Sequence, residues 1–475
     1  MTRERINWRK DPRATAAIVA SALFMQNLDS SVVATALPAM ARDLESTPVH
    51  LSAAITSYLV ALTVFVPVSG WVADRYGAKR VFLWAIAVFV AASMACGLSQ
   101  NLPQLILARV VQGLGGAMMV PVARLLLLRQ VNKEDLVRAT TWLTMPGLLG
   151  PIMGPPLGGF LTDTLSWHWV FWINLPVGLL GLVLAWRFIT PPPQDRPPRL
   201  DVVGVLLVGL SLAALMAGLE TIGRELIPPP WPALLLGAGA VLGVLAVRHC
   251  RRVPHPAVDL TLLRFPAFQS AVVAGTLFRL GAGATPFLVP LTLQLGFGAS
   301  ATTSGLVSLA SALGALGMKP VVRPVLRRFG FRNTLIWNTV FQALAIAGLA
   351  LLTPAWPLAG VFVLLAVGGV FRSLHFTSLN SLAYAEIPQP RLSAATSLYS
   401  TAQQLSMALG VVTGSTALTA AVALSGQSGP SLGSFAIAFL AVAAITLISI
   451  PMVMRLPPDA GAAVSGHQPK AAGKG

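Results

Sequence analysis

Long apolar runs separated by short polar segments fill the chain from about residue 14 to residue 454. A helix needs about 20 mostly apolar residues to cross a bilayer, so each run of this length predicts a membrane-spanning helix. We predict fourteen spans, at roughly 14–37, 51–73, 81–99, 103–124, 139–162, 168–189, 202–221, 231–249, 267–292, 301–318, 333–353, 356–379, 394–424 and 432–454.

Lysines and arginines are distributed unevenly between the two sides of these spans. If the N-terminus lies in the cytoplasm and the spans alternate, nearly all of the 33 basic residues fall in inner segments, with Arg372 counted among them. Arg42 and Arg224 fall in outer loops, and Arg109 and Arg279 fall inside spans. Cytoplasmic loops of membrane proteins carry an excess of lysine and arginine, so both termini are predicted to be cytoplasmic.

The composition excludes a set of soluble domains. Apolar residues make up 55% of the chain and charged residues 10%, whereas a soluble globular chain carries about 25% charged residues. The net charge of +17 comes from basic residues scattered over short polar gaps, so we expect no nucleic-acid partner. Cys96 and Cys250 predict neither a disulfide framework nor a zinc site, and we expect no metal and no cofactor. The sequence contains no G-x-x-x-x-G-K-[ST] phosphate loop, so uphill transport would use an ion gradient.

A weak internal repeat relates two polar turns. Residues 70–80 follow the second predicted span and residues 323–333 follow the tenth, so that Arg75, Gly77 and Lys79 align with Arg328, Gly330 and Arg332. Internal repeats of this kind are typical of transporters. We therefore predict an all-α polytopic membrane protein with two six-helix bundles and two inserted helices. The predicted parts are a bundle over 1–190, an insert with cytoplasmic linkers over 191–263, a bundle over 264–455 and a disordered cytoplasmic tail over 456–475.

The first of these turns is a candidate gate. Asp74 lies at the end of the second span, basic residues follow it, and Gly77 can form a tight turn between two helices. A charged turn of this kind can cap helix ends and pair with a neighbouring helix in one transport state. The alternative is that its basic residues only anchor the loop on the cytoplasmic side. The residues assigned to this gating loop are Gly70, Asp74, Arg75, Gly77, Lys79 and Arg80.

Asp29 is the only acidic residue well inside a predicted span. An intramembrane carboxylate is costly and is treated as functional by default. Arg109 lies inside the fourth span, where a charge is also costly unless it is paired or hydrated. We predict that Asp29 and Arg109 couple transport to protons. A structural ion pair between the two side chains, or snorkelling of Arg109 to the outer surface, are the alternatives, and a pair is compatible with coupling.

Asn27, Gln112 and Arg279 are expected to line a central substrate cavity. Arg279 lies near the middle of the ninth span, too deep for easy snorkelling, and no acid is predicted to be buried in the second half. By the repeat, the ninth span corresponds to the first, so we expect Arg279 and Asp29 to meet across the cavity. Two arginines and one aspartate favour an anionic substrate mildly. Pairing of Arg279 with backbone carbonyls is the alternative.

The fifth span contains glycines at four-residue spacing and two Gly-Pro pairs. Small residues at this spacing let helices pack closely, and prolines bend a membrane helix. We predict a bent, closely packed hinge beside the cavity that limits ion leak. Its residues are Gly150, Pro151, Gly154, Pro155, Gly158 and Gly159.

Together these motifs resemble the major facilitator superfamily. The pattern G-x-x-x-D-R-x-G-x-[KR]-[KR] at 70–80 is similar to its signature loop, residues 109–113 to its R-x-x-Q-G pattern, and the Gly-Pro run to the antiporter motif of its drug exporters. Residues 167–178 are close to the W-R-W-x-F-x-I-N-x-P-x-G run of the fourteen-span drug:proton antiporters of EmrB/QacA type, with His168 in place of the usual arginine. Residues 115–124, 279–283 and 317–319 resemble the MdtD-type multidrug transporters most.

The resemblance implies a proton-driven exporter of the bacterial inner membrane with a central cavity between its halves. Its implied partners are a small-molecule substrate, protons, the lipid bilayer and accessory export proteins. Multidrug export by alternating access is the leading hypothesis, and export of an anionic metabolite or metal chelate is the alternative. A non-transporting receptor or a membrane-embedded enzyme belongs to another class. We do not expect an enzyme, because the six histidines of the chain are spread along the sequence and only one carboxylate is predicted to be buried in a span. No role is assigned to His168 or Arg372.

Overall fold

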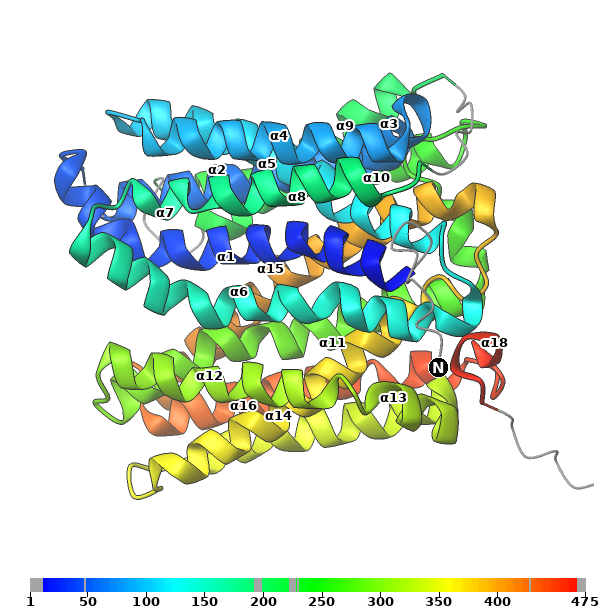
Figure 1. Ribbon diagram of the computed structural model, residues 1–475. Helices are drawn as coiled ribbons and strands as arrows, with labels where there is room; N and C mark the ends of the chain where they lie inside the picture. Colours follow the sequence, from blue (N-terminus) through cyan, green and yellow to red (C-terminus); the bar gives the residue numbers. More distant parts are fainter. Residues whose placement is uncertain are drawn as a thin grey trace, which may run out of the picture. The chain divides into compact units, whose positions relative to one another are not determined.

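The computed structural model describes residues 12–46, 48–191, 199–221, 228, 230–426 and 429–467. Regular structure in this part of the chain is entirely helical (Figure 1). The contacts divide the chain into two compact units. Unit 1 comprises residues 1–132, 142–261 and 388–401, and unit 2 comprises residues 133–141, 262–387 and 402–475. The predicted two-helix insert therefore belongs to the same unit as the first bundle.

Unit 1 is built from membrane-length helices joined by short turns. Its elements are α1 (Pro12–Asp43), α2 (Pro48–Phe65), a 3₁₀ turn (Val66–Val68), α3 (Ser69–Tyr76), α4 (Ala78–Gly97), α5 (Leu102–Leu128), α6 (Leu136–Thr164, whose first turns belong to unit 2), α7 (Trp169–Trp172), α8 (Asn174–Phe188), α9 (Val202–Thr221) and α10 (Trp231–Cys250).

Local sequence fixes where several of these helices begin and how they pack. Asn101 caps α5, because its side-chain oxygen accepts a hydrogen bond from the Gln104 amide at 3.0 Å, and Pro103 occupies the first turn. α4 packs along both α5 and α8, and these helices run side by side in Figure 1. α9 packs on α2, and α10 packs on α9. The inserted pair is thus attached to unit 1 through α2.

Unit 2 has the same kind of architecture. Its elements are a short 3₁₀ segment (Leu260–Arg264), α11 (Pro266–Leu291), a π-helical segment (Thr292–Gly296), α12 (Ala301–Met318), α13 (Val322–Gly348), α14 (Leu358–Leu382), α15 (Leu392–Ser425, whose first residues belong to unit 1), α16 (Leu432–Leu447), α17 (Ile450–Met454) and α18 (Ala462–Ser465).

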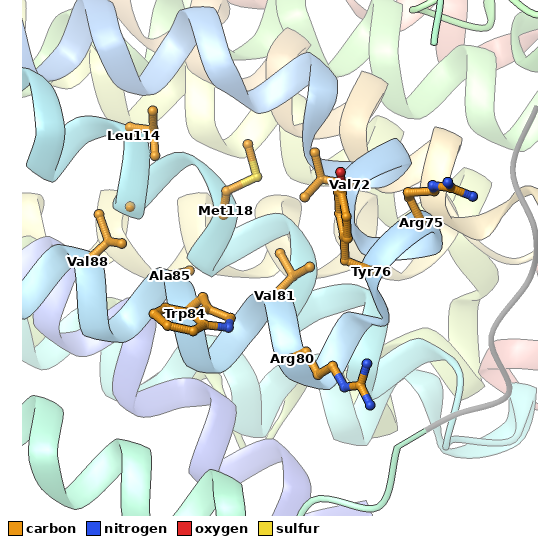
Figure 2. Close-up of a pocket in the computed structure, with 11 residues that line it drawn as sticks. Val72, Arg75, Tyr76, Arg80, Val81, Trp84, Ala85, Val88, Leu114 and Met118 are labelled. Carbon is orange, nitrogen blue, oxygen red and sulfur yellow. The ribbon is translucent and has the colours of Figure 1, made fainter. Parts of the chain in front are cut away.

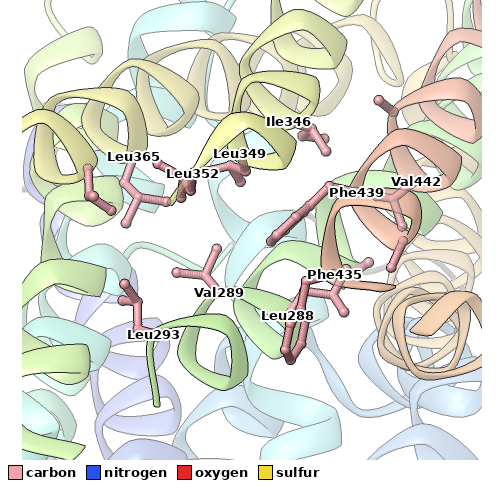
Figure 3. Packing of buried hydrophobic residues seen from close by; sticks show 14 of the residues in the cluster. Leu288, Val289, Leu293, Ile346, Leu349, Leu352, Leu365, Phe435, Phe439 and Val442 are labelled. Atoms are coloured by element: carbon pink, nitrogen blue, oxygen red, sulfur yellow. The ribbon is translucent and has the colours of Figure 1, made fainter. Parts of the chain in front are cut away.

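The core of unit 2 lies where α11, α13, α14 and α16 meet. Leu288 and Phe435 are almost completely buried there, and Phe439 lies beside Ile346 and Val442 (Figure 3). In a bilayer, lipid tails are as apolar as these side chains. The helices are therefore held together by close packing and by buried hydrogen bonds rather than by escape from water.

Twelve helices in the described residues are long and apolar enough to cross a membrane. Every one of the fourteen predicted spans is helical, but the spans at 139–162 and 301–318 are not among the twelve. The first corresponds to α6, in which four internal prolines lower the mean hydropathy. The second corresponds to α12, whose apolar part within the described residues, Thr303–Met318, is short. The prediction of a polytopic all-α protein is confirmed, and the count of fourteen spans is not.

The C-terminal segment differs from the prediction of a disordered tail. Residues 456–467 fold back on α13, where Leu456 and Val464 are buried. Gly461 has a φ of 68° and lies so close to the Phe331 ring that a side chain there would clash. The His467 ring contacts the Arg327 carbonyl oxygen at 3.1 Å. The prediction is wrong for these residues because apolar groups in the tail find a surface to cover, and residues 468–475 lie outside the described part.

Candidate functional site

Asp29 and Arg109 form an ion pair in unit 1, which was the structural alternative to proton coupling and is compatible with it. Asp29 lies in the middle of α1 and Arg109 in the second turn of α5, and Nη1 of the arginine lies 2.6 Å from Oδ2 of the aspartate. Both residues are 0% exposed. Asp29 is also the only buried aspartate or glutamate within the described residues. Arg109 therefore reaches inward to the carboxylate and does not snorkel to the surface.

Two amide side chains complete the binding of the carboxylate. Gln112 donates from Nε2 to Asp29 Oδ1 at 2.9 Å, and its own Oε1 accepts from Arg109 Nη1 at 2.7 Å. Asn174, at the start of α8, donates from Nδ2 to the same Asp29 oxygen at 3.0 Å and to Ser93 Oγ at 2.9 Å. We call Asp29, Arg109, Gln112 and Asn174 the carboxylate network. It joins α1, α5 and α8.

The arginine is also held by groups of α2 and α7. Its Nε donates to the Ala54 carbonyl oxygen at 3.2 Å, and its guanidinium carbon lies 4.3 Å from the centre of the Tyr58 ring. Phe171 contributes a second ring at 5.8 Å. A buried ion pair repays its desolvation only when the remaining donors and lone pairs are satisfied, and these contacts do so for most of the guanidinium.

Asn27 does not join the carboxylate network, although it is only two residues from Asp29. Its Nδ2 donates to the Gly147 carbonyl oxygen of α6 at 3.0 Å. In an α-helix the Gly147 carbonyl oxygen would accept a hydrogen bond from the backbone amide of residue 151. Pro151 has no amide hydrogen and cannot donate it. The Asn27 amide takes that place. The predicted cavity roles of Asn27 and Gln112 stay predictions.

The glycines of α6 form the surface that packs on α1. An added Cβ at Gly150 would lie 2.7 Å from the Leu28 amide nitrogen, and one at Gly154 would lie 2.5 Å from Ser31 Cβ. An added Cβ at Gly158 would lie 2.1 Å from Thr35 Oγ1, whereas one at Gly159 would meet nothing within 4 Å. Pro151 and Pro155 lie on the exposed side of the helix. Three glycines at four-residue spacing thus lie against α1, and the role of this helix as a leak-limiting hinge stays a prediction.

The gating loop has the tight turn that was predicted. Gly77 ends α3 and begins α4 with φ 90° and ψ 121°, a conformation that favours glycine. Asp74 Oδ1 accepts from Arg129 Nη2 at 2.7 Å, and its other oxygen accepts from the Ser393 hydroxyl at the start of α15. An added Cβ on Gly70 would lie 2.5 Å from the Ser393 carbonyl oxygen. The turn therefore contacts a segment more than 300 residues away, within unit 1.

The basic residues of this turn differ in their surroundings. Lys79 donates from Nζ to the Trp186 carbonyl oxygen at 2.8 Å, whereas Arg75 and Arg80 are exposed. The predicted repeat appears in the backbone, because Gly330 interrupts α13 with a φ of 71°, as Gly77 separates α3 from α4.

Arg279 is 0% exposed in unit 2, where its guanidinium carbon lies 5.7 Å from the centre of the Phe376 ring. Asp29 belongs to unit 1, so the predicted meeting of the two side chains stays a prediction. Arg372 needs a correction, since the count of basic residues placed it on the inner side. It lies inside α14, well before the end of that helix, and borders a small cavity with Thr285 and Gln342.

Asn174 is the network member that sequence reasoning missed. It lies within residues 167–178, a stretch rich in aromatic residues, but a neutral amide gives no charge signal and its partner Asp29 is 145 residues away. The aromatic run itself packs as expected for large rings. His168 stacks on Trp167 with 3.9 Å between ring centres, and the Trp167 indole donates to Asp43 at 2.7 Å.

Comparisons with known proteins agree with this architecture. The family model of the Major Facilitator Superfamily matches residues 19–411 and residues 271–473. A protein of Pectobacterium atrosepticum named "Putative multidrug resistance protein MdtD" is 37% identical over 445 residues, covering 93% of this chain and 95% of its own. The protein of that name from Klebsiella pneumoniae subsp. pneumoniae is 37% identical over 454 residues and is covered to 94%, as is this chain.

Two solved structures share the fold at low sequence identity. The human organic anion transporter MFSD10 superposes with a TM-score of 0.67 at 14% identity, covering 93% of this chain and 99% of that one. The proton:xylose symporter XylE superposes with a TM-score of 0.66 at 12% identity, covering 94% and 96%. The spans, the buried carboxylate network, the glycine turn and these matches lead to one conclusion: the chain belongs to the major facilitator superfamily of membrane transporters, and within it resembles the MdtD-type multidrug transporters.

Proposed function

We propose that this protein exports small molecules across the bacterial inner membrane in exchange for protons, by alternating access, with both termini in the cytoplasm. Its relatives carry the name of multidrug resistance proteins, which supports a drug-like substrate range. The observation that carries proton coupling is the carboxylate network, because it places a buried carboxylate against a buried arginine and two amide donors.

Protonation of Asp29 would remove the negative charge that Arg109 faces at 2.6 Å. The arginine would keep contacts with Gln112 and with the Ala54 carbonyl, but these are neutral acceptors. Leaving a buried charge without its counter-ion costs about 3–5 kcal/mol. The arrangement of α1 against α5 and α8 would then become less stable than one in which Arg109 finds water or another anion. Proton binding thus biases the protein between two conformations.

The gating loop would transmit this bias. Asp74 joins α3 to Arg129 of the same unit and to Ser393 of α15, and Ser397 of α15 donates to the Val66 carbonyl oxygen at 2.9 Å. These contacts depend on the close approach at Gly70 and on the turn at Gly77. A conformational change that moves the start of α15 away from α3 must break the Ser393 and Ser397 contacts together. We assign the loop to control of the conformational cycle rather than to substrate recognition.

The tight contact between α1 and α6 would keep the network rigid and dry. Gly150, Gly154 and Gly158 bring the backbones together on one side of α1, while Asp29 faces α5 and α8 on another. Water that entered between α1 and α6 would hydrate the ion pair and let protons pass without substrate. Close packing of small residues therefore supports the role of this helix in limiting leak.

Export of an anionic metabolite or metal chelate is the second candidate. Arg279 is buried in unit 2, and Arg372 lies inside α14 of the same unit. No aspartate or glutamate is buried among the described residues of that unit. Cations at this depth in a membrane protein are functional candidates, and they can bind a negatively charged group of a substrate. Lipophilic cations would instead depend on Asp29.

A transport screen in everted vesicles separates the two candidates. Vesicles containing the protein are given a proton gradient with the acidic side in the vesicle lumen. Uptake of organic cations is then compared with uptake of carboxylates and metal chelates. The proposal expects gradient-driven uptake of at least one class, abolished when the gradient is collapsed. Uptake that is unaffected by collapse of the gradient would contradict proton exchange, and uptake of anions alone would favour the second candidate.

A further inference from the structure

A pocket of about 400 Å³ lies on the surface of unit 1 where α3, α4 and α5 meet (Figure 2). Cavities of about 300–1,000 Å³ are the usual size of small-molecule sites. The lining of this pocket includes no residue of the carboxylate network and does not include Asp74. The lining residues are Val72, Arg75, Tyr76, Arg80, Val81, Trp84, Ala85, Val88, Leu114, Gly115 and Met118.

The pocket has an apolar length and a basic end. Val88 and Leu114 lie at one end, and Arg75 and Arg80 lie at the other, beside the turn between α3 and α4 (Figure 2). The lining contains two arginines and no acidic residue. The aromatic side chains between the two ends are highly exposed for their size, since Trp84 is 72% exposed and Tyr76 is 57% exposed. On helices of membrane length such side chains face lipid, and tryptophan and tyrosine prefer the interfacial region.

We propose that this pocket binds one anionic phospholipid. Its phosphate would lie between Arg75 and Arg80, and one acyl chain would run along Val81, Trp84 and Leu114. Basic pockets between membrane helices near the interface bind anionic head groups, because arginine matches a phosphate with several donors while the helices below match the acyl chain. The charge at one end and the apolar surface over the rest fit a lipid better than a peptide or a second copy of the chain.

A bound lipid would brace the gating loop from its membrane side. Arg75 lies in the last turn of α3 and Arg80 in the first turn of α4, so a phosphate held by both would bridge the two helices across Gly77. Asp74 is engaged on another side by Arg129 and Ser393. The lipid site is therefore separate from the Asp74 contacts, and the proposal concerns binding alone. It can fail without affecting the proposed transport function.

The test uses the full chain purified in a mild detergent and native mass spectrometry of the intact complex. The protein is titrated with dioleoyl phosphatidylglycerol or with dioleoyl phosphatidylcholine, which share acyl chains and differ in net charge. The wild type should retain one phosphatidylglycerol at concentrations where phosphatidylcholine is not retained. This comparison needs no variant. Equal retention of the two lipids, or retention of neither, would overturn the proposal.

Variants then locate the site. The double variant Arg75→Gln/Arg80→Gln should bind phosphatidylglycerol about 30-fold more weakly, since each basic group near an anionic surface contributes on the order of 1 kcal/mol. Arg75→Lys/Arg80→Lys keeps the charge and should keep most of the binding. The matched control is Arg251→Gln/Arg252→Gln, which removes two exposed arginines at the end of α10, outside the pocket. Weakening of equal size in the control, or no weakening at Arg75 and Arg80, would overturn the assignment to this pocket.

Discussion

Gly154 provides a quantitative test of the contact between α1 and α6. In Gly154→Ala, the new methyl carbon would lie 1.9 Å from Ser31 Oγ and 2.5 Å from Ser31 Cβ. The hydroxyl can rotate, but Cβ is fixed to the backbone of α1, so the two helices must move apart. Overpacking of this kind costs about 1–3 kcal/mol. Replacing glycine by alanine in a helix gains at most about 1 kcal/mol, so the net effect should be destabilising.

Gly159→Ala is the matched control, five residues further along the same helix. An added Cβ at this position meets nothing within 4 Å, so only the gain in helix propensity remains. Thermal unfolding of the purified proteins should therefore give changes of opposite sign, with a lower midpoint for Gly154→Ala and an unchanged or higher midpoint for Gly159→Ala. Combining Gly154→Ala with Ser31→Gly should restore part of the loss. Equal midpoints for Gly154→Ala and Gly159→Ala would refute the packing of α6 on α1.

Three further predictions concern other parts of the protein. Asp74→Asn should slow transport of every substrate alike with little change in binding affinity, measured as initial rates and dissociation constants for two unrelated substrates; a selective change in one affinity would argue for recognition. Arg279→Ala should lose transport of anionic substrates before that of others, while Arg279→Lys keeps part of it, and normal anion transport by the alanine variant would exclude the role. Burial by itself raises the pKa of Asp201. Hydrogen bonds from the Gly204 amide, His249 and the Ala257 amide together lower the pKa by more than burial raises it, so the pKa lies below its usual value. A lowered pKa contributes stability above about pH 4 that is lost as the pH falls through the folded-state pKa. The thermal midpoints of wild type and Asp201→Asn should therefore converge below about pH 4, and a constant gap would contradict this linkage.

Charge made the centre of the site predictable from the sequence. A lone carboxylate and an arginine in apolar runs must each find a partner, and in unit 1 they find each other. Gly77 was predictable for a similar reason, since a turn between two helices favours a residue that tolerates positive φ.

Features that depend on helix rotation or distant contacts were not predictable. Asn174 reaches Asp29 only because α8 packs beside α1, and Asn27 turns to α6 because Pro151 leaves a carbonyl without its donor. Gly158 and Gly159 are adjacent in sequence, yet one faces α1 and the other meets nothing within 4 Å. Arg372 was counted among the inner residues although the predicted span 356–379 already contains it, so the hydropathy pattern placed this residue correctly and the count did not.

The central claim is that protonation of Asp29 drives export. The most direct measurement compares wild type with Asp29→Asn in everted vesicles, with substrate accumulation followed under an imposed proton gradient and downhill exchange followed without one. The amide keeps the size of the side chain but removes the charge, and a thermal midpoint shows whether the variant folds. Folded Asp29→Asn should still exchange substrate downhill but accumulate none against its gradient. Uphill accumulation by Asp29→Asn at the wild-type rate would contradict it.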